Sequence, residues 1–459
     1  MYRIDFHTPV HLHFMGIGGI SMSGLAEILL KEGFTISGSD AVRSSLTDHL
    51  ASLGAQIQIG QRAENIQEGI DAVVYTAAIR PDNPEYAAAT AAGLPMITRA
   101  ELLGQIMSNY PTAIAVAGTH GKTTTTSMLS TILLAADKDP TITVGGILPQ
   151  IGGNIRVGHS DTFLTEACEY TNSYLSFFPT VSIILNIEED HMDFFKDLSD
   201  IRDSFHRFAG LLPEDGLLVL NKEIADPQEI TEGLSAKVVT YGLSGTEDYT
   251  ADSISYDKEG CASFRLIHGK KEVGTITLHV PGLHNVSNAL AAIAASTELQ
   301  IPFADIQKGI AAFSGTDRRF QYKGTWNNVT IIDDYAHHPT EIRATLNTAV
   351  NYPHKELWCV FQPHTYTRTS AFLKDFAKAL SLADHVVLAD IYAAREKNTI
   401  GISSLDLLKE LQNLGTDCHY YPSFEEIEKF LSKKCMHGDL LITMGAGDVV
   451  KIGENLLSR

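Results

Sequence analysis

The chain has 459 residues, 44% of them hydrophobic and 20% charged, which is the balance of a globular protein with roughly two to four domains. Its formal net charge of −20 argues against nucleic acid as a partner, because nucleic-acid binding needs a basic surface, and any anionic substrate requires locally clustered cations. The five cysteines form no C-x-x-C pair, so we expect neither disulfides nor a structural zinc site. No apolar run reaches about 18 residues, so we expect no membrane insertion, and we expect a cytoplasmic location.

The N-terminal region, to about residue 100, alternates between predicted strands and predicted helices. Strands are expected at VHLHFM, FTISGSD and DAVVYTAAI, and helices at SMSGLAEILLKEG, SLTDHLASLGA and PEYAAATAAG. This alternation is typical of a parallel sheet with helical crossovers. The segment YPTAIAVAG, in which Pro111 follows the polar SNY, predicts the boundary to a second domain.

A glycine-rich turn follows the first predicted strand. Gly16 and Gly18 match the first two glycines of a dinucleotide-binding fingerprint, and Ser21 stands at the third. Asp40 follows at about the distance of the acid that binds a ribose. We favour a loop whose backbone holds a diphosphate, while the alternative is a turn that only lets the strand meet its helix.

A second glycine-containing turn lies in AVAGTHGKTTTT, residues 115–126. It departs from the usual phosphate loop, because Val116 stands where the first glycine belongs and Gly118 comes two residues late. An apolar strand still enters a turn whose N–H groups can cradle phosphate at a helix N-terminus. Lys122 is then expected at the terminal phosphates and Thr123 at a magnesium ion. A plain strand-to-helix turn is the alternative, but G-K-T-T before an apolar helix favours nucleotide binding.

Acidic residues follow the next two predicted strands. DTFLTEACEY predicts a strand that delivers Glu166 to its end, and VSIILNIEEDHMDFF predicts a buried strand that ends before Glu188, Glu189, Asp190 and His191. Beside a phosphate loop, Glu166 and His191 are candidates to hold a second magnesium ion next to a developing acyl phosphate. Helix capping or a solvated loop is the alternative, and we favour it for Glu188 and Glu189.

Residues 213–280 predict no chemistry, and the polar alternation in KVVTYGL, CASFRLI and TITLHV predicts antiparallel strands that extend the central domain. The following PGLHNVSNALAAIAAS predicts a helix in which Asn288 lies one turn after His284. These two side chains either address a base or only cap and pack the helix. In GTDRRFQ, Arg318 and Arg319 form either an anion clamp or an ordinary surface pair.

From near Tyr322 the alternation of strands and helices returns. Predicted strands in VTIIDDYAHHPTEI and WCVFQPHTYTR end in polar clusters, and HVVLADI and LLITMGAGDVV follow the same design. Ligands bind beyond the carboxyl ends of strands in open parallel sheets, so these clusters predict a site. Its candidate residues are Asp333, Asp334, Tyr335, His337, His338, His364, Tyr366 and Arg368. Pro339 is expected to begin a helix with Ile342 and Leu346 on its buried face.

Eight motifs stand in order along the chain: HFMGIGGISMSG, AGTHGKTTTT, NIEEDHMDFF, LHNVSNALAA, GTDRRFQ, DDYAHHPTEI, FQPHTYTRT and GAGD. Together they resemble the Mur ligases from near His11 to near Val450, and G-T-H-G-K-T is that family's form of phosphate loop. The resemblance implies an α/β enzyme of three domains. These are an N-terminal Rossmann-like domain for a UDP-sugar at 1–108, a central P-loop ATPase-type α/β domain at 109–321, and a C-terminal Rossmann-like domain at 322–459 that closes over them.

The motifs are most similar to the branch of the family that joins L-alanine to UDP-N-acetylmuramate for peptidoglycan synthesis. The resemblance implies that ATP activates the sugar carboxylate as an acyl phosphate, with two magnesium ions, and that the enzyme is a monomer or a homodimer. One competing function is the ligase that attaches a whole peptide to the same sugar nucleotide in cell-wall recycling, and GIGGISMSG favours the first. The other is a nucleotide-binding protein without turnover, against which the intact Lys122, Glu166, His191 and Arg368 argue.

The resemblance also implies roles for individual residues. The residues implied for ATP binding are Gly118, Thr119, His120, Gly121, Lys122, Thr123, Thr124, His284, Asn288, Arg319 and Asp334. Of these, His284 and Asn288 are expected near the adenine and Asp334 near the ribose. For the UDP-sugar it implies Gly16, Gly18, Gly19, Ser21, Asp40 and His364. For the metal ions it implies Thr123, Glu166 and His191. For catalysis it implies Lys122, Glu166, His191, His337 and Arg368, with His364 also orienting the acyl phosphate and the amine.

The chain departs from the family pattern at three positions. Ser21 stands where many members have glycine, although serine can still cap the following helix. Thr365 stands where many relatives have arginine, which leaves Arg368 as the local cation. Cys168 replaces an expected aspartate, so Glu166 is the metal candidate in that segment.

Overall fold

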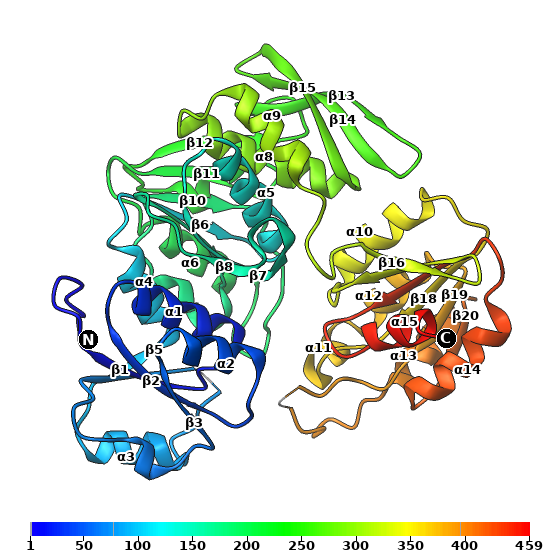
Figure 1. Ribbon diagram of the computed structural model, residues 1–459. Helices are drawn as coiled ribbons and strands as arrows, with labels where there is room; N and C mark the ends of the chain where they lie inside the picture. The colour runs from blue at the N-terminus through cyan, green and yellow to red at the C-terminus, as the bar shows by residue number, and fades with distance from the viewer. Residues whose placement is uncertain (1, 77, 395) are drawn as a thin grey trace.

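The computed structural model describes residues 2–76, 78–394 and 396–459 and contains three domains, each built on its own sheet (Figure 1). The blue N-terminal domain, the cyan and green central domain and the yellow to red C-terminal domain are arranged around a common junction (Figure 1). This confirms the predicted α/β fold with three domains. None of the helices within the described residues is long and apolar enough to cross a membrane.

The N-terminal sheet has five parallel strands in the order β3-β2-β1-β4-β5. Its middle strands are buried on both faces by helices, as parallel strands require. Inside it, His13 and Glu85 form a fully buried pair with 2.9 Å between Nε2 and Oε1. The elements are β1 (His11–Met15), α1 (Ile20–Lys31), β2 (Thr35–Asp40), α2 (Ser45–Ser52), β3 (Gln56–Ile59), η1 (Ala63–Asn65), β4 (Ala72–Tyr75), α3 (Pro84–Ala91), β5 (Met96–Thr98) and α4 (Arg99–Met107).

The central sheet has ten strands in the order β15-β14-β13-β12-β11-β10-β6-β9-β7-β8. The strand in KVVTYGL, predicted to be antiparallel, is β12 and pairs in parallel with β11, because the crossover through α7 returns the chain in the same direction. The strands in CASFRLI and TITLHV are β14 and β15, and the projecting hairpins β13 to β15 are antiparallel as predicted. The elements up to the middle of the domain are β6 (Thr112–Ala117), α5 (Lys122–Ala135), β7 (Thr141–Leu148), η2 (Pro149–Ile151), β8 (Gly153–Arg156), β9 (Thr162–Ala167), η3 (Tyr170–Ser176), β10 (Val181–Ile184) and α6 (Leu198–Ala209). The others are β11 (Leu217–Asn221), α7 (Gln228–Thr231), β12 (Lys237–Gly242), β13 (Tyr249–Tyr256), β14 (Cys261–His268), β15 (Lys271–Pro281), α8 (Leu283–Glu298) and α9 (Phe303–Ala312).

The C-terminal sheet has six strands in the order β16-β17-β21-β18-β19-β20, all parallel except β16. The helix expected to begin at Pro339 is α10, and its predicted face is correct because Ile342 and Leu346 are fully buried. The elements are β16 (Gln321–Trp326), β17 (Val329–Asp334), α10 (Pro339–Val350), β18 (Leu357–Phe361), α11 (Tyr366–Ala371), α12 (Leu373–Leu380), β19 (His385–Leu388), α13 (Ser404–Asn413), β20 (Asp417–Tyr420), α14 (Phe424–Lys434), β21 (Leu440–Met444) and α15 (Val450–Leu457).

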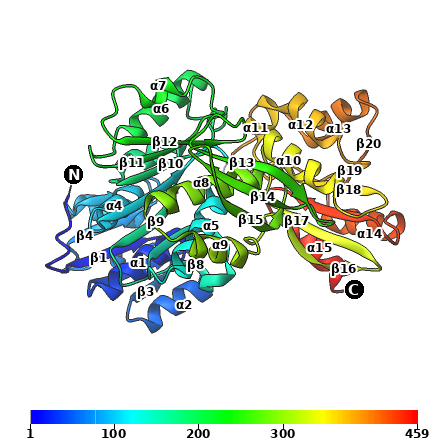
Figure 2. The same ribbon diagram turned by 90° about the horizontal axis from the view of Figure 1, so that it is seen from above.

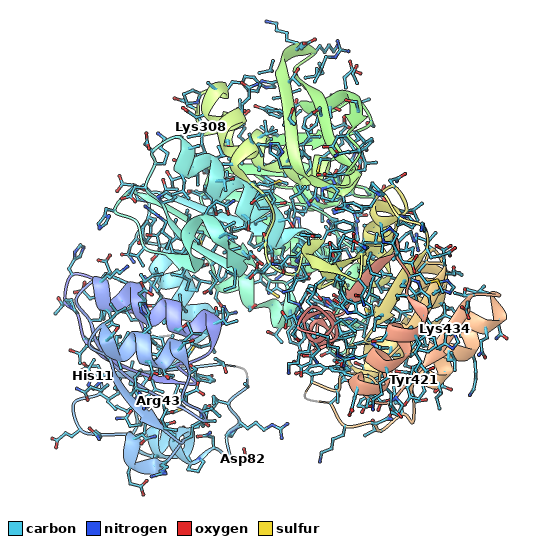
Figure 3. All side chains as sticks on the ribbon, turned by 45° about the vertical axis from the view of Figure 1, so that its right-hand side comes forward. His11, Arg43, Asp82, Lys308, Tyr421 and Lys434 are labelled. Carbon is cyan, nitrogen blue, oxygen red and sulfur yellow. The ribbon has the colours of Figure 1, made fainter. Side chains whose placement is uncertain are left out.

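The two domain interfaces differ in chemistry. The N-terminal and central domains share one apolar core, in which α4 packs so closely on η3 that a Cβ on Gly104 would lie 1.9 Å from the carbonyl oxygen of Ser176. The C-terminal domain has apolar cores of its own and meets the central domain through ion pairs and hydrogen bonds, such as that between Asp190 and Arg368. Seen from above in Figure 2, it stands beside the other two domains. Figure 3 shows the side chains of all three, with Arg43, Lys308 and Lys434 labelled on successive domains.

Candidate active site

The turn after β6 leaves N–H groups free at a helix start. Gly118 and Gly121 have φ of +147° and +84°, where an L-residue is strained, and a Cβ on Gly121 would lie 2.6 Å from Oδ1 of Asn288. Within the described part of the chain, the backbone N–H groups of residues 121–124 donate no hydrogen bond. Free N–H groups at the positive end of a helix dipole bind anions, so this turn is built to hold phosphate.

The segment after β10 braces this turn. Thr119 donates its N–H to the carbonyl of Asn186 at 3.1 Å, and His120 donates its N–H to the Asn186 side chain at 2.7 Å. The Asn186 amide returns a hydrogen bond to the His120 carbonyl at 3.0 Å. The strand and the loop are therefore locked together before any ligand binds, which lowers the entropy lost on binding.

Lys122 points back over the turn. Its Nζ donates to the carbonyl oxygens of Gly118 and Thr119 and lies 3.0 Å from Oε2 of Glu169. Burial alone would lower the pKa of Lys122, but the charge and hydrogen bond of Glu169 together with the nearby Cys168 and Glu166 raise that pKa, so the amine is a cation at neutral pH. The sequence motifs do not single out Glu169, which is 2% exposed, although the E-x-x-E spacing in TEACE after a buried strand was a signal for it.

Two pairs of side chains have the donors that a divalent cation needs. Glu166, at the end of β9 as predicted, accepts from the Thr123 hydroxyl at 3.1 Å and from the Gly145 N–H at 2.5 Å. Nε2 of His191 lies 3.8 Å from Oε1 of Glu169 and 3.8 Å from Oδ2 of Asp190, and the His191 backbone has a φ of +53°. A hydroxyl with carboxylate oxygens fits Mg²⁺, and an imidazole beside them is an additional donor.

A cavity of about 620 Å³, the junction cavity, is lined by all three domains. The N-terminal domain contributes Ile20, at the first turn of α1. The central domain contributes the phosphate turn and all three predicted metal ligands, Thr123, Glu166 and His191. The C-terminal domain contributes Tyr335 and His337. Chemistry in this cavity therefore requires the three domains together.

A second cavity of about 190 Å³, the α8 cavity, opens beside the phosphate turn. It is lined by these residues of the predicted ATP set: His120, Gly121, Thr124, His284, Asn288, Arg319 and Asp334. His284 is exposed to it, whereas Asn288 is buried and accepts from the Thr125 hydroxyl at 3.3 Å. The Asp334 carboxylate accepts backbone N–H groups of Phe320 and Ala336 at 2.8 and 2.7 Å, and burial raises its pKa to about 6.

The two neighbouring arginines do not act as a pair. Arg318 turns into the C-terminal domain, where its Nε lies 3.0 Å from Oδ2 of Asp333 and its Nη2 donates to the carbonyl of Gly445. Arg319 lines both cavities, and its nearest acid is Glu341 at 3.9 Å. Arg318 also lines the junction cavity, but Asp333 and Gly445 hold its guanidinium, so Arg319 is the one of the two that is available for an anion.

A third cavity of about 670 Å³, the Arg368 cavity, lies on the other side of His191. Arg368 forms an ion pair of 2.7 Å with Asp190 and lies 3.1 Å from Nδ1 of His364. Burial lowers the pKa of both His337 and His364 to about 4, so both imidazoles are neutral at pH 7. His364 thus lies in this cavity with three of the predicted catalytic residues, His191, His337 and Arg368, and not beside the first glycine turn.

The backbone N–H groups of the first glycine turn all donate hydrogen bonds within the protein. Gly16 and Ile17 donate to the carbonyl of Ser39 at 2.8 and 2.9 Å. Gly18 donates to Oδ2 of Asp40 at 2.9 Å, and Gly19 donates to the carbonyl of Gly16 at 3.1 Å. The turn predicted to hold diphosphate is therefore satisfied internally. Among the described residues, free N–H groups begin only with residues 20–22, in the first turn of α1.

Arg99, at the start of α4, lies beside that first turn and is not among the residues predicted from the sequence. Its Nη1 donates to the Ser21 hydroxyl at 3.0 Å, and a cavity of about 270 Å³ adjoins both residues. Among residues 2–76, 78–394 and 396–459, Arg99 has no carboxylate within ion-pair distance. An arginine without an acid in a recessed site is suited to an anionic ligand.

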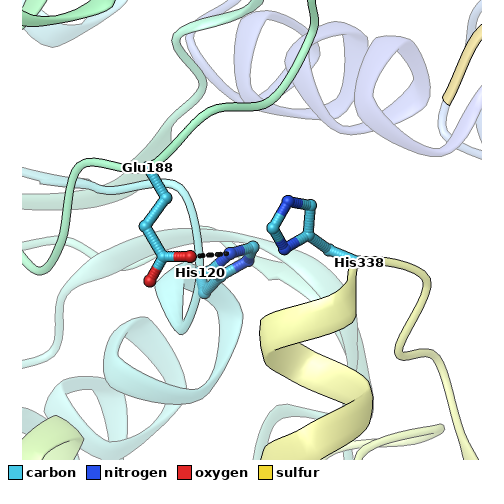
Figure 4. A group of neighbouring side chains, drawn as sticks. All are labelled: His120, Glu188 and His338. Atoms are coloured by element: carbon cyan, nitrogen blue, oxygen red, sulfur yellow. Dashed lines mark ion pairs between the residues drawn. The ribbon is translucent and has the colours of Figure 1, made fainter. Parts of the chain in front are cut away.

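His120, Glu188 and His338 are close enough together to suggest a metal site (Figure 4). However, Nε2 of His338 donates to the carbonyl of Glu189 at 3.0 Å, and its Nδ1 accepts from the Thr340 N–H at 3.3 Å. Both imidazole nitrogens are used, so His338 has none left for a metal. The group is therefore a polar contact between the central and C-terminal domains.

Comparisons with known proteins agree with this arrangement. Residues 11–111 match the model of the Mur ligase family catalytic domain, 116–296 that of the Mur ligase middle domain, and 318–447 that of the Mur ligase glutamate ligase domain. The chain is 63% identical to the UDP-N-acetylmuramate--L-alanine ligase of Agathobacter rectalis, over all of both chains. It is 49% identical to the enzyme of that name from Caldanaerobacter subterraneus subsp. tengcongensis, over 100% of this chain and 99% of the other.

Solved structures have the same architecture. The UDP-N-acetylmuramate-alanine ligase MurC from Thermotoga maritima superposes with a TM-score of 0.82 at 30% identity and covers 98% of this chain and 99% of its own. A murein peptide ligase from Psychrobacter arcticus superposes with a TM-score of 0.71 at 26% identity, over 98% of each chain. The chain belongs to the Mur ligase family.

Proposed function

We propose that this enzyme joins L-alanine to the carboxylate of UDP-N-acetylmuramate at the expense of ATP, in peptidoglycan precursor synthesis. The observation that carries the proposal is the junction cavity, in which a cationic lysine, free helix N–H groups and three candidate metal ligands meet side chains from all three domains. The activity for which relatives up to 63% identical over the full chain are named supports the same substrates.

ATP fits the α8 cavity with its phosphates at the phosphate turn. His284 and Asp334 line the cavity where base and ribose are expected, and Arg319 lies where this cavity meets the junction cavity. Lys122 is in place to neutralise the β and γ phosphates. Thr123 and Glu166 would hold one magnesium ion, and Glu166 with His191 a second, which neutralise the phosphate charge when bound.

The reaction proceeds in two steps. A carboxylate oxygen of the sugar substrate attacks the γ phosphorus, the bond to the bridging oxygen of ATP breaks, and ADP and an acyl phosphate form. The alanine nitrogen then attacks the acyl carbon, and phosphate leaves. The ammonium proton must be lost before that attack. The imidazoles of His337 and His364 on the junction and Arg368 cavities are neutral at pH 7, so each has a lone pair that can accept a hydrogen bond from the amine.

The sugar nucleotide needs cations in an acidic protein. Arg99, the Ser21 hydroxyl and the free N–H groups of residues 20–22 gather at one point beside the junction cavity. We infer that they hold the anionic part of the sugar nucleotide, while Gly16, Gly18, Gly19 and Asp40 shape the turn that leads to them. With ATP as co-substrate, the activity belongs in the cytoplasm, and we propose a monomer or homodimer with domains at 1–108, 109–321 and 322–459.

Phosphate release from ATP tests the function directly. Purified protein with Mg²⁺ and UDP-N-acetylmuramate is expected to release phosphate only when L-alanine is added, with glycine, L-serine and the recycled tripeptide as comparison acceptors. Release with the tripeptide alone would instead assign the enzyme to cell-wall recycling. If the folded protein binds ATP but releases no phosphate with any of these acceptors, the ligase assignment is contradicted.

A further inference from the structure

Glu341 is an acidic residue to which neither the sequence motifs nor the proposed function assigns a role. It is the third residue of α10, its side chain is 13% exposed, and it lines both the α8 cavity and the junction cavity. A glutamate at this helix position usually accepts the N–H of the N-cap residue. Here the N-cap is His338, and Glu341 instead accepts the N–H of His337, one residue earlier.

The Glu341 carboxylate contacts three residues of the predicted site. Its Oε2 lies 3.1 Å from the His337 backbone nitrogen and 3.4 Å from His337 Nδ1. Its Oε1 lies 3.3 Å from Nδ1 of His120, in the phosphate turn, and 3.9 Å from Nη1 of Arg319. One carboxylate therefore connects the ATP turn of the central domain to the histidine that the C-terminal domain brings to the junction cavity.

The charges favour this connection. Burial alone would raise the pKa of Glu341, but the neighbouring His337, His120 and Arg319 hold it well below its usual value. Burial alone would lower the pKa of His120, but Glu188 and Glu341 raise it to about 9. At neutral pH, Glu341 and His120 are thus an anion and a cation that join two domains, in a place where water screens them little.

The same contacts fix the orientation of His337. Nδ1 of His337 lies 3.0 Å from the carbonyl of Tyr335, which can only accept, and 3.4 Å from Glu341. Nδ1 therefore carries the proton, and Nε2 is the nitrogen with a free lone pair. This tautomer is the one that an acceptor of a hydrogen bond from the amine requires.

We propose that Glu341 is a positioning residue that couples the phosphate turn to amide formation, by holding His337 in place through an ion pair with His120. The inference rests on the proposed ligase function and goes beyond it in giving the two half-reactions a physical link. Glu341 contacts neither predicted metal ligands nor the free N–H groups of the turn. Its removal should therefore act on the second half-reaction more than on the first.

Single-turnover kinetics of the full-length enzyme separate the two halves. With enzyme in excess over UDP-N-acetylmuramate and with ATP, Mg²⁺ and L-alanine present, ADP and the alanine-linked product are measured in the same quenched samples. In Glu341→Gln we expect ADP to form within about 2-fold of the wild-type rate and the amide to form about 10- to 100-fold more slowly, the scale of a misplaced reacting group. Glu341→Asp keeps the charge with less reach and should recover part of the amide rate.

A helix-capping role predicts a different result, because glutamine also accepts an N–H bond. If Glu341→Gln forms both products at the wild-type rates, or slows both equally with an unchanged ratio, the positioning role is wrong. Failure of the wild-type enzyme itself to form the alanine-linked product would reject the proposed function instead. Thermal unfolding of each variant shows whether it is folded, and Glu341→Asp carries the test if Glu341→Gln is not.

A double-mutant cycle tests the coupling itself. His120→Asn removes the cation and keeps a polar side chain of similar size. If the ion pair acts as one unit, the double variant His120→Asn with Glu341→Gln should form the amide no more slowly than the slower single variant. Rate losses that multiply would show that the two residues act independently and would overturn the coupling.

Discussion

The two glycine turns that follow β1 and β6 begin alike and differ in what they leave free. The turn at Gly118 keeps the N–H groups of residues 121–124 free and has Lys122 in its own sequence. The turn at Gly16 consumes its N–H groups on Ser39, Asp40 and itself, and its cation, Arg99, comes from a helix about 80 residues later in the chain. A glycine pattern thus predicts the shape of a turn, but the hydrogen bonds around it decide whether its backbone can bind.

The largest effect is expected at the second turn. Lys122→Ala should lower turnover at least about 10²–10³-fold, because a preorganised cation at the transferring phosphate is lost. Binding of UDP-N-acetylmuramate, followed by calorimetry, should stay nearly unchanged, because that ligand is assigned to the other turn. Wild-type turnover in this variant would show that the turn at Gly118 is not the phosphoryl-transfer site.

The same variant needs a stability control. Removing Lys122 leaves Glu169, which is 2% exposed, without its cation, and an unpaired buried charge costs about 3–5 kcal/mol. The double variant Lys122→Ala with Glu169→Gln should regain much of that stability in a denaturant titration while its turnover stays low. Recovery of turnover together with stability would mean that Lys122 serves the fold alone.

A smaller effect on turnover is expected when a predicted metal ligand beside the second turn is removed. His191→Ala should raise the Mg²⁺ concentration for half-maximal turnover about 10- to 100-fold, because a donor beside Glu169 is lost. The exposed His437 offers a matched control, and His437→Ala should leave the titration unchanged. An identical titration curve for His191→Ala would remove this residue from the metal site.

The first turn should respond through substrate affinity and not through rate. Arg99→Ala should raise KM for UDP-N-acetylmuramate about 10- to 100-fold, the cost of a charge-assisted hydrogen bond, with KM for ATP within about 2-fold. Arg207→Ala, at an exposed arginine of α6, is the matched control. A change in KM for ATP alone would show that Arg99 acts through the second turn.

Chemistry carried by short motifs could be predicted from the sequence, and so could the alternation that gives three sheets. Glu166 at the end of β9 and the helix from Pro339 with Ile342 and Leu346 buried are examples. In these cases the information is local, since a strand end or a helix face follows from neighbouring residues. The predicted antiparallel direction of β12 was wrong because strand direction depends on the crossover and not on the strand's own pattern.

The residues that the sequence did not predict act through partners that are distant in the chain. Arg99 meets Ser21 from a different helix, Glu169 is identified by its pairing with Lys122, and Glu341 by its contacts with His120. The pairings themselves have no spacing that a sequence pattern could reveal, although the E-x-x-E spacing in TEACE was a signal for Glu169. The internal hydrogen bonds of the Gly16 turn are equally invisible, because Ser39 and Asp40 lie on the neighbouring strand.

The smallest effect on substrate affinity is expected at Ser21. This residue tests whether the first turn, like the second, binds its ligand through a residue of its own sequence. Ser21→Ala removes a neutral hydroxyl that accepts from Arg99, which is worth about 1 kcal/mol, or about 5-fold in KM for UDP-N-acetylmuramate. If the hydroxyl acts only by orienting Arg99, adding Ser21→Ala to Arg99→Ala should cause no further rise in KM. A further rise would mean that Ser21 contacts the ligand itself, so that the first turn, like the second, binds partly through residues of its own sequence.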